Sequence, residues 1–240
     1  MSRLPVALFA FSIAVPAVLA QEAGFDRIQA GIHEIYDATR PAVVGIQARG
    51  GRFGRGGDGY GSGVVIDLDK RLVLTSEEAV PAAAKEANVR FADHTLVAAK
   101  VVARNDELNA VLLEAPSIPA SVRVLAMGDS TKVRVGTMVF TLGNPFQSML
   151  QTGQTAASLG IVSGIYRAEG NAVYDGVVFE LDAAVNPGSY GGPVVDLEGR
   201  VIALVGSTYS HARWLGTAVP IAPIREWVEE AARERGVAVA

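Results

Sequence analysis

The feature that most constrains the fold is a series of short runs rich in valine, leucine and isoleucine that begins at Gly63. Turn signals separate several of these runs, as at 67–70 (Asp-Leu-Asp-Lys) and 196–199 (Asp-Leu-Glu-Gly). Many short strands at this spacing predict an all-β barrel or sandwich and argue against a βαβ fold. The predicted strands are 41–46, 64–68, 72–75, 88–91, 96–103, 110–113, 137–142, 177–181, 193–196, 200–206 and 217–219.

A helix is predicted on each side of this β-rich region. The N-terminal helix is expected to be short and amphipathic and to end before Pro41, and the C-terminal helix to stop near Gly236. The apolar residues at helical spacing are Phe25, Ile28, Ile32 and Ile35 in the first helix, and Ile224, Trp227, Val228 and Ala231 in the second.

Residues 49–63 form a glycine-rich stretch, with eight glycines in fifteen positions. Glycine at this density predicts a long flexible loop. The repeated Arg-Gly pattern of 49–57 also resembles an RNA-binding RGG segment. Nucleic-acid binders usually carry a strong basic excess, whereas this chain has a net charge of −4. We therefore expect no nucleic-acid partner.

The first twenty residues have the pattern of a secretory signal peptide. Arg3 gives a positive start, an apolar stretch runs to Ala20, and small residues stand where cleavage would occur. The alternative is a membrane anchor, but a stretch interrupted by Pro5 and Pro16 is short for a span of about 20 residues. We expect export to the periplasm or extracellular space, with no membrane span after cleavage.

Cysteine and histidine usage limits the chemistry. The absence of cysteine excludes disulfides, thiolate metal sites and a cysteine nucleophile. The three histidines, His33, His94 and His211, are scattered, which argues against a histidine-rich metal site. We predict no metal and no cofactor.

The segment 188–193 (Gly-Ser-Tyr-Gly-Gly-Pro) is the first candidate for a site. Glycines around a tight loop let backbone N–H groups point into a pocket, as an oxyanion hole requires, although a plain glycine turn between strands has the same composition. Five further segments accompany the loop in order: 61–67, 142–146, 160–164, 182–188 and 215–220.

Together these motifs resemble the trypsin-like domain of the HtrA/Deg serine endopeptidases, over roughly Gly61 to Trp227. The resemblance implies a trypsin-like double Greek-key β-barrel with the active cleft between two six-stranded barrels. It divides the chain into a signal peptide (1–20), a segment with the N-terminal helix, first strand and Gly-rich loop (21–57), and a peptidase domain (58–240). We expect no PDZ domain.

The three catalytic positions depart from the family pattern. Glu78 stands where the family has histidine, Asn109 where it has aspartate, and Tyr190 where it has the nucleophilic serine. The resemblance therefore implies a degenerate triad and a pseudoprotease.

The substituted side chains do not suit triad chemistry. A carboxylic acid with a pKa of about 4.3 is a poor base for a phenol near 10, and a tyrosine hydroxyl projects beyond the place of a serine Oγ. Asn109 is expected to donate a hydrogen bond to Glu78, which makes the trio a packed polar cluster or a recognition surface. The alternative is an active hydrolase that uses Ser189, with His211 as the histidine closest to the cleft.

Peptide binding does not need the triad. The resemblance implies strand addition along the cleft, with Gly188, Ser189, Tyr190 and Gly191 forming the oxyanion loop and peptide-binding site. Tyr209 and Trp214 are candidates for aromatic surface there. The expected partner is a peptide or protein, including an active protease relative, and the N-terminal helix leaves homo-oligomer formation open.

Overall fold

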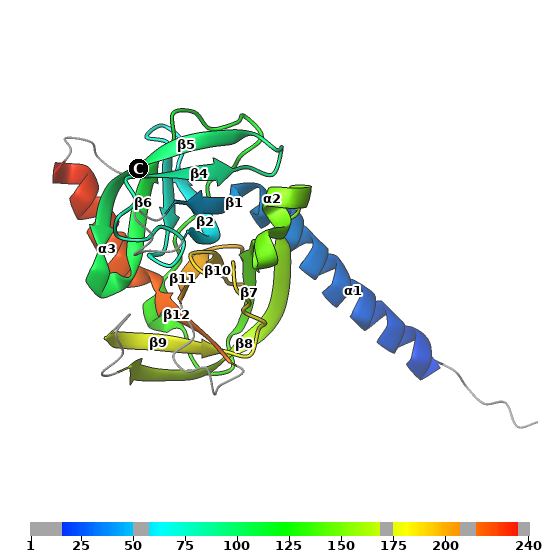
Figure 1. Ribbon diagram of the computed structural model, residues 1–240. Helices are drawn as coiled ribbons and strands as arrows, with labels where there is room; N and C mark the ends of the chain where they lie inside the picture. The colour runs from blue at the N-terminus through cyan, green and yellow to red at the C-terminus, as the bar shows by residue number, and fades with distance from the viewer. Residues whose placement is uncertain (1–15, 50–57, 169–174, 207–214, 235–240) are drawn as a thin grey trace, which may run out of the picture. The chain divides into compact units, whose positions relative to one another are not determined.

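The computed structural model describes residues 16–49, 58–168, 175–206 and 215–234 (Figure 1). Residues up to Glu34 form one unit and those from Ile35 onward another. Helix α1 (Pro16–Thr39) crosses this boundary and ends before Pro41, as predicted. At 24 residues it is not the short helix expected, and it begins inside the segment predicted as a signal peptide. Proline suits a first helical turn because its fixed φ is compatible with a helix and its missing N–H has no partner there.

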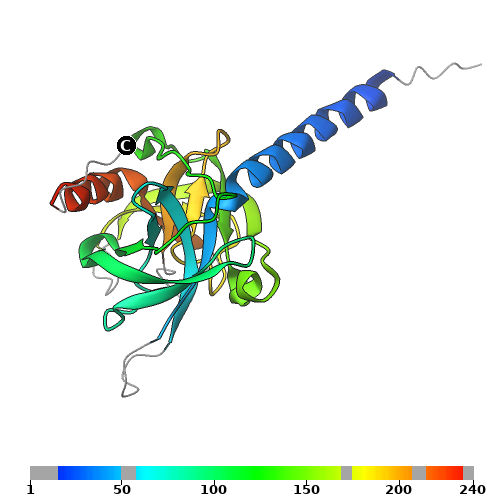
Figure 2. The ribbon, with the colours of Figure 1, turned by 90° about the horizontal axis from the view of Figure 1, so that it is seen from above.

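From Ile35 onward the chain forms two closed six-stranded barrels, which confirms the double barrel predicted from the sequence (Figures 1 and 2). All strand pairs within them are antiparallel. The first barrel has the order β1-β2-β3-β6-β5-β4 and the second β10-β11-β12-β9-β8-β7. The strands are β1 (Val43–Ala48), β2 (Gly59–Asp67), β3 (Leu72–Thr75), β4 (Glu86–Arg90), β5 (Leu96–Asn105), β6 (Ala110–Glu114), β7 (Met138–Gly143), β8 (Ala156–Ala168), β9 (Gly176–Leu181), β10 (Pro193–Val195), β11 (Val201–Gly206) and β12 (Gly216–Pro220).

Most strands shift at an end by one or two residues from the sequence prediction, and three differences have a structural reason. β1 starts two residues late because Pro41 lies in a 3-10 turn, η1 (Arg40–Ala42). β2 starts at Gly59, so the last part of the stretch expected to be a flexible loop is ordered strand. β8 was not predicted as a strand, although it pairs with both β7 and β9.

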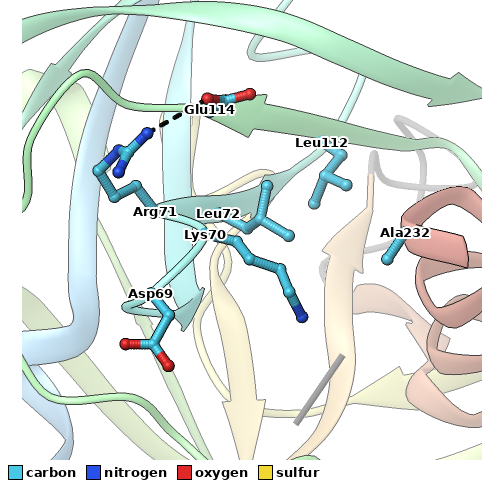
Figure 3. Close-up of a pocket in the computed structure, with 7 residues that line it drawn as sticks. All are labelled: Asp69, Lys70, Arg71, Leu72, Leu112, Glu114 and Ala232. Carbon is cyan, nitrogen blue, oxygen red and sulfur yellow. Dashed lines mark hydrogen bonds and ion pairs between the residues drawn. The ribbon is translucent and has the colours of Figure 1, made fainter. Parts of the chain in front are cut away.

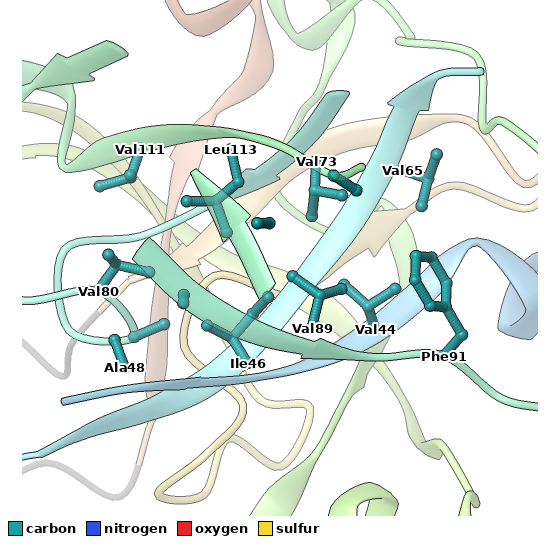
Figure 4. Packing of buried hydrophobic residues seen from close by; sticks show 14 of the residues in the cluster. Val44, Ile46, Ala48, Val65, Val73, Val80, Val89, Phe91, Val111 and Leu113 are labelled. Carbon is teal, nitrogen blue, oxygen red and sulfur yellow. The ribbon is translucent and has the colours of Figure 1, made fainter. Parts of the chain in front are cut away.

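The core of the first barrel is formed by alternate residues of its strands, which point inward (Figure 4). Val44 and Ile46 from β1 lie in one cluster with Val65 from β2, Val73 from β3 and Val89 from β4, and all five are fully buried. Burial of each such side chain contributes about 1.5–3 kcal/mol. The second barrel has its own core, which includes Val139, Val162 and Phe179.

Helix α3 (Ile221–Glu234) follows the second barrel and packs against β11. Three of the four residues of its predicted apolar face, Ile224, Val228 and Ala231, are buried, and Trp227 is half-buried. Gly236, the predicted stop, lies outside the described residues. None of the described helices combines the length and apolarity that a membrane crossing requires.

Candidate functional site

The candidate site is the loop between β9 and β10, at Asn186–Gly192, where the second barrel meets β2 of the first. Gly188 has φ +97° and Gly191 has φ +79°, both in the left-handed region that favours glycine. Space is also restricted, because a Cβ on Gly191 would lie 2.5 Å from the carbonyl oxygen of Ser62. The two glycines therefore fix a loop shape that other residues would disturb.

Ser62 of β2 holds this loop from the first barrel. Its hydroxyl donates to the Gly188 carbonyl oxygen at 2.7 Å and accepts from the Asn144 N–H at 2.7 Å. The Ser62 N–H donates to the Tyr190 carbonyl oxygen at 2.8 Å. Ser62 is fully buried, so these three hydrogen bonds are shielded from water. One side chain thus links both barrels and the loop.

Asn144 supports the loop from the end of β7. Its side-chain Nδ2 donates to the Gly61 carbonyl oxygen at 3.2 Å, and its Oδ1 accepts from the Met149 N–H at 2.6 Å. The motifs 61–67 and 142–146 contain Ser62 and Asn144, but the sequence predicts no role for either residue. The available signal was a polar residue next to glycine beside an apolar run.

The orientation of Gly188 follows from its peptide bond with Pro187. The Pro187 carbonyl oxygen accepts a hydrogen bond from the Phe146 N–H at 2.8 Å. In a trans peptide the N–H points opposite to the C=O, so the Gly188 N–H is turned away from Phe146. Within the described residues it has no hydrogen-bond acceptor. Because Gly188 is buried, this donor is suited to the carbonyl oxygen of a ligand.

Glu78 and Asn109, the residues predicted to stand at the base and acid positions, are in direct contact. Asn109 follows a 3-10 turn, η2 (Asp106–Leu108), and its φ of +49° is one that asparagine tolerates. Asn109 Nδ2 donates to Glu78 Oε1 at 2.9 Å and to Oε2 at 3.0 Å, which confirms the predicted hydrogen bond. Asn109 Oδ1 accepts from the Glu77 N–H at 3.2 Å. The amide of Asn109 is therefore engaged through both of its ends.

Tyr190, which the sequence predicts at the nucleophile position, is half-buried and packs against the hydrophobic core of the second barrel. Val185 packs against the same core and lies close to Gly216: a Cβ added to Gly216 would be 2.3 Å from Cγ2 of Val185. The tyrosine ring is therefore part of the packing of the second barrel.

Ser189 points into a different environment from that of Glu78. It is 7% exposed, and its Oγ accepts from the Asn186 N–H at 3.4 Å. It lines a cavity of about 180 Å³ that also includes Thr141 and Ser158. Across the described residues, no histidine or carboxylate is hydrogen-bonded to the Ser189 hydroxyl.

The histidines occupy other positions. His94 lies in the β4–β5 turn, as predicted, and packs against Gly153. His33 lies on α1, as predicted. His211 and the two aromatic candidates Tyr209 and Trp214 lie outside the described residues.

Two charged groups near Glu78 have shifted pKa values. Burial raises the pKa of the Glu77 carboxyl, and a hydrogen bond and charge repulsion from Asp106 raise it further. Burial lowers the pKa of Arg104. The guanidinium of Arg104 donates to the carbonyl oxygens of Val80, Pro81 and Ala84, so it fixes the segment that follows Glu78.

A second cavity, of about 310 Å³, lies between the first barrel and the last turns of α3 (Figure 3). Arg71 and Glu114 form an ion pair of 3.5 Å at its edge, and Leu72, Leu112 and Ala232 give it apolar walls. It contains none of the candidate site residues, so the loop at Gly188 remains the centre of the site.

The comparisons with known proteins agree with this architecture. Residues 61–204 match the model of the trypsin-like peptidase domain. The chain is 35% identical over 148 residues to a probable periplasmic serine protease do/HhoA-like of Haemophilus influenzae, covering 61% of this chain and 30% of that protein. It is 34% identical over 162 residues to the periplasmic serine endoprotease DegP of Escherichia coli K12, covering 65% of this chain and 33% of DegP.

Among solved structures, the HtrA-type protease AlgW with tripeptide has the same fold, with a TM-score of 0.70 and 24% identity over 85% of this chain and 64% of that one. The chain spans about a third of the length of the curated relatives above. The family match, these relatives and the two barrels with their loop at Gly188 show that the chain belongs to the trypsin-like peptidase family, in its HtrA/Deg group.

Proposed function

We propose that this protein is a non-hydrolytic member of the HtrA/Deg group that binds extended peptides or unfolded proteins at the loop Gly188–Gly191. Its expected roles are scaffolding or regulation of an active relative. The proposal includes export to the periplasm or extracellular space after removal of residues 1–20, which agrees with the names of the periplasmic relatives.

The observation that carries the proposal is the pair formed by Glu78 and Asn109. In a serine protease triad, a base takes the proton of the nucleophile and a carboxylate orients that base. Here the group at the base position is itself a carboxylate, and both of its oxygens accept hydrogen bonds from the Asn109 amide. The two oxygens that would have to take the proton of the nucleophile are therefore already engaged by the Asn109 amide.

Tyr190 supports the same conclusion. A phenol has an ordinary pKa about 6 units above that of a carboxylic acid, and closing that gap costs roughly 8 kcal/mol. The Tyr190 ring packs on the core of the second barrel, so its substitution for serine is accommodated as a structural residue.

The loop, in contrast, keeps the features that binding requires. The Gly188 N–H is oriented by the hydrogen bond between Phe146 and Pro187, and Ser62 holds the carbonyl groups on either side of Ser189. A preorganised backbone donor binds a peptide carbonyl without any contribution from the triad. This geometry supports a peptide or unfolded protein as the ligand.

The proposal is tested with fluorescein-labelled unfolded casein as the probe. Fluorescence anisotropy should show saturable binding to the purified protein, and mass spectrometry should show intact casein after incubation. Absence of binding contradicts the proposal, as does cleavage that disappears in Ser189→Ala, which would establish the active hydrolase instead.

Two glycines provide a matched pair for the binding assay. Gly188→Ala would place a Cβ 2.4 Å from the Asn144 carbonyl oxygen and should weaken casein binding. Gly199→Ala introduces the same kind of left-handed strain, at φ +74°, in the β10–β11 turn and should leave binding unchanged. Equal losses in both variants would show that the loop is not the binding site.

A further inference from the structure

Phe146 is a large apolar side chain that stands in solvent beside the candidate site. Its exposed fraction is 66%, although it belongs to the segment that supports the Gly188 loop. The backbone N–H of the same residue donates to the Pro187 carbonyl oxygen at 2.8 Å. The ring therefore belongs to the residue whose backbone N–H binds the Pro187–Gly188 peptide unit, and this unit sets the direction of the Gly188 N–H.

The backbone at this position is strained. Phe146 has φ +52° and Gln147 has φ +60°, so two consecutive non-glycine residues have a left-handed backbone conformation. Each such residue costs roughly 1–2 kcal/mol relative to a right-handed conformation. Strain of this kind persists only where the surrounding structure imposes it, and it concentrates at functional sites.

The surrounding contacts that impose the strain are those of the site itself. The Gln147 N–H donates to the Asn144 carbonyl oxygen at 3.1 Å, and Asn144 is fully buried. The Phe146 N–H is bound to Pro187, so the turn is fixed at both residues. As a result, the fold holds an aromatic ring outside its core at a cost in stability.

The size of the feature indicates the kind of ligand. A stable protein–protein interface buries roughly 800 Å² on each partner, whereas one aromatic side chain supplies about 150–250 Å². A single exposed ring on the segment that holds the Pro187–Gly188 peptide unit suits one residue of an extended chain, which binds the Gly188 N–H with a carbonyl oxygen and carries a neighbouring side chain farther along.

We propose that Phe146 determines the specificity of the peptide site, by packing against an apolar side chain next to the residue whose carbonyl oxygen binds the Gly188 N–H. This inference rests on the proposed peptide-binding function and names its substrate class: extended peptides with an apolar residue at that position.

The test uses two fluorescein-labelled dodecapeptides rich in alanine and serine, which are identical except for one central residue, leucine in one and aspartate in the other. Wild type should bind the leucine peptide about tenfold more tightly, which corresponds to about 1.4 kcal/mol. Phe146→Ala should remove this preference by weakening binding of the leucine peptide alone. Phe146→Lys should reverse it, which gives a gain of binding that a folding defect cannot mimic.

Leu68 provides the matched control, because it is an apolar side chain with 44% exposure in the β2–β3 turn. Leu68→Ala should leave both affinities unchanged. If wild type binds unfolded casein but treats both dodecapeptides alike, or if Phe146→Ala keeps the preference, the specificity role is wrong and the peptide-binding function stands. If wild type binds neither casein nor the peptides, the proposed function fails, and the role of Phe146 fails with it.

Discussion

Replacement of Ser62 by alanine tests how the loop is held. The hydroxyl of Ser62 donates to the Gly188 carbonyl and accepts from the Asn144 N–H, both at 2.7 Å, in a fully buried position. Alanine removes one atom and leaves both backbone groups without this partner. Leaving a buried donor or acceptor unpaired costs about 1–3 kcal/mol each.

The expected loss in the free energy of unfolding is therefore about 2–6 kcal/mol for Ser62→Ala. For a chain of this size, 1 kcal/mol shifts the melting temperature by roughly 2–4 °C, so the expected fall is about 4–24 °C. Casein binding should also weaken at temperatures where the variant is folded, because the orientation of the Gly188 peptide is released.

Ser76 supplies the control for this substitution. It is fully buried as well, but its Oγ has no hydrogen-bond partner in the part of the chain that the structure describes. Ser76→Ala should therefore be neutral or slightly stabilising, since an unpaired hydroxyl is removed. Thermal unfolding followed by circular dichroism measures both variants. A Ser62→Ala melting temperature within about 2 °C of wild type, or an equal loss in Ser76→Ala, would refute this reasoning.

Two further predictions concern stability. Burial and Asp106 raise the pKa of Glu77 above its ordinary value of 4.5, so the folded state holds this proton more tightly than the unfolded state does. The contribution of Glu77 to stability is therefore largest below that pH and is lost as pH rises through the raised pKa. Glu77→Gln should flatten this part of the stability–pH profile, and an unchanged profile argues against the assignment. Gln147→Gly should stabilise the protein by about 1 kcal/mol, because glycine relieves the left-handed strain. The control Ser148→Gly, at φ −54°, should destabilise it by about 0.5–1 kcal/mol. Urea titration measures the free energy of unfolding of both variants.

Much of the fold could be predicted from the sequence because each barrel strand carries a short apolar run bounded by turns. β8 (Ala156–Ala168) is the exception, since it is rich in alanine, serine and glycine and has no clear alternation. It is a strand because β7 and β9 both pair with it, which is tertiary context that a local pattern does not contain. Gly61 belongs to a glycine-rich stretch typical of a loop, yet it lies in β2 for a related reason. The strand passes so close to the Tyr190 carbonyl oxygen that a Cβ on Gly61 would lie 2.7 Å from it.

The candidate site was predictable where one motif supplied both the residue and its partner. The hydrogen bond from Asn109 to Glu78 was expected from the two family positions and is present. Ser62 and Phe146 were not expected to matter, because their roles depend on distances between segments far apart in the chain. Backbone strain at Phe146 is likewise a property of the folded turn.

The central claim is that this fold binds peptides without hydrolysing them, and it is tested most directly by a serine-directed fluorophosphonate combined with an unfolded-casein hydrolysis assay. We expect wild type to remain unlabelled and inactive. The variant Glu78→His/Asn109→Asp/Tyr190→Ser should become labelled and cleave casein if the loop is intact, and its continued inactivity would contradict our inference of a preserved loop. Casein turnover by wild type that disappears in Ser189→Ala would contradict the account.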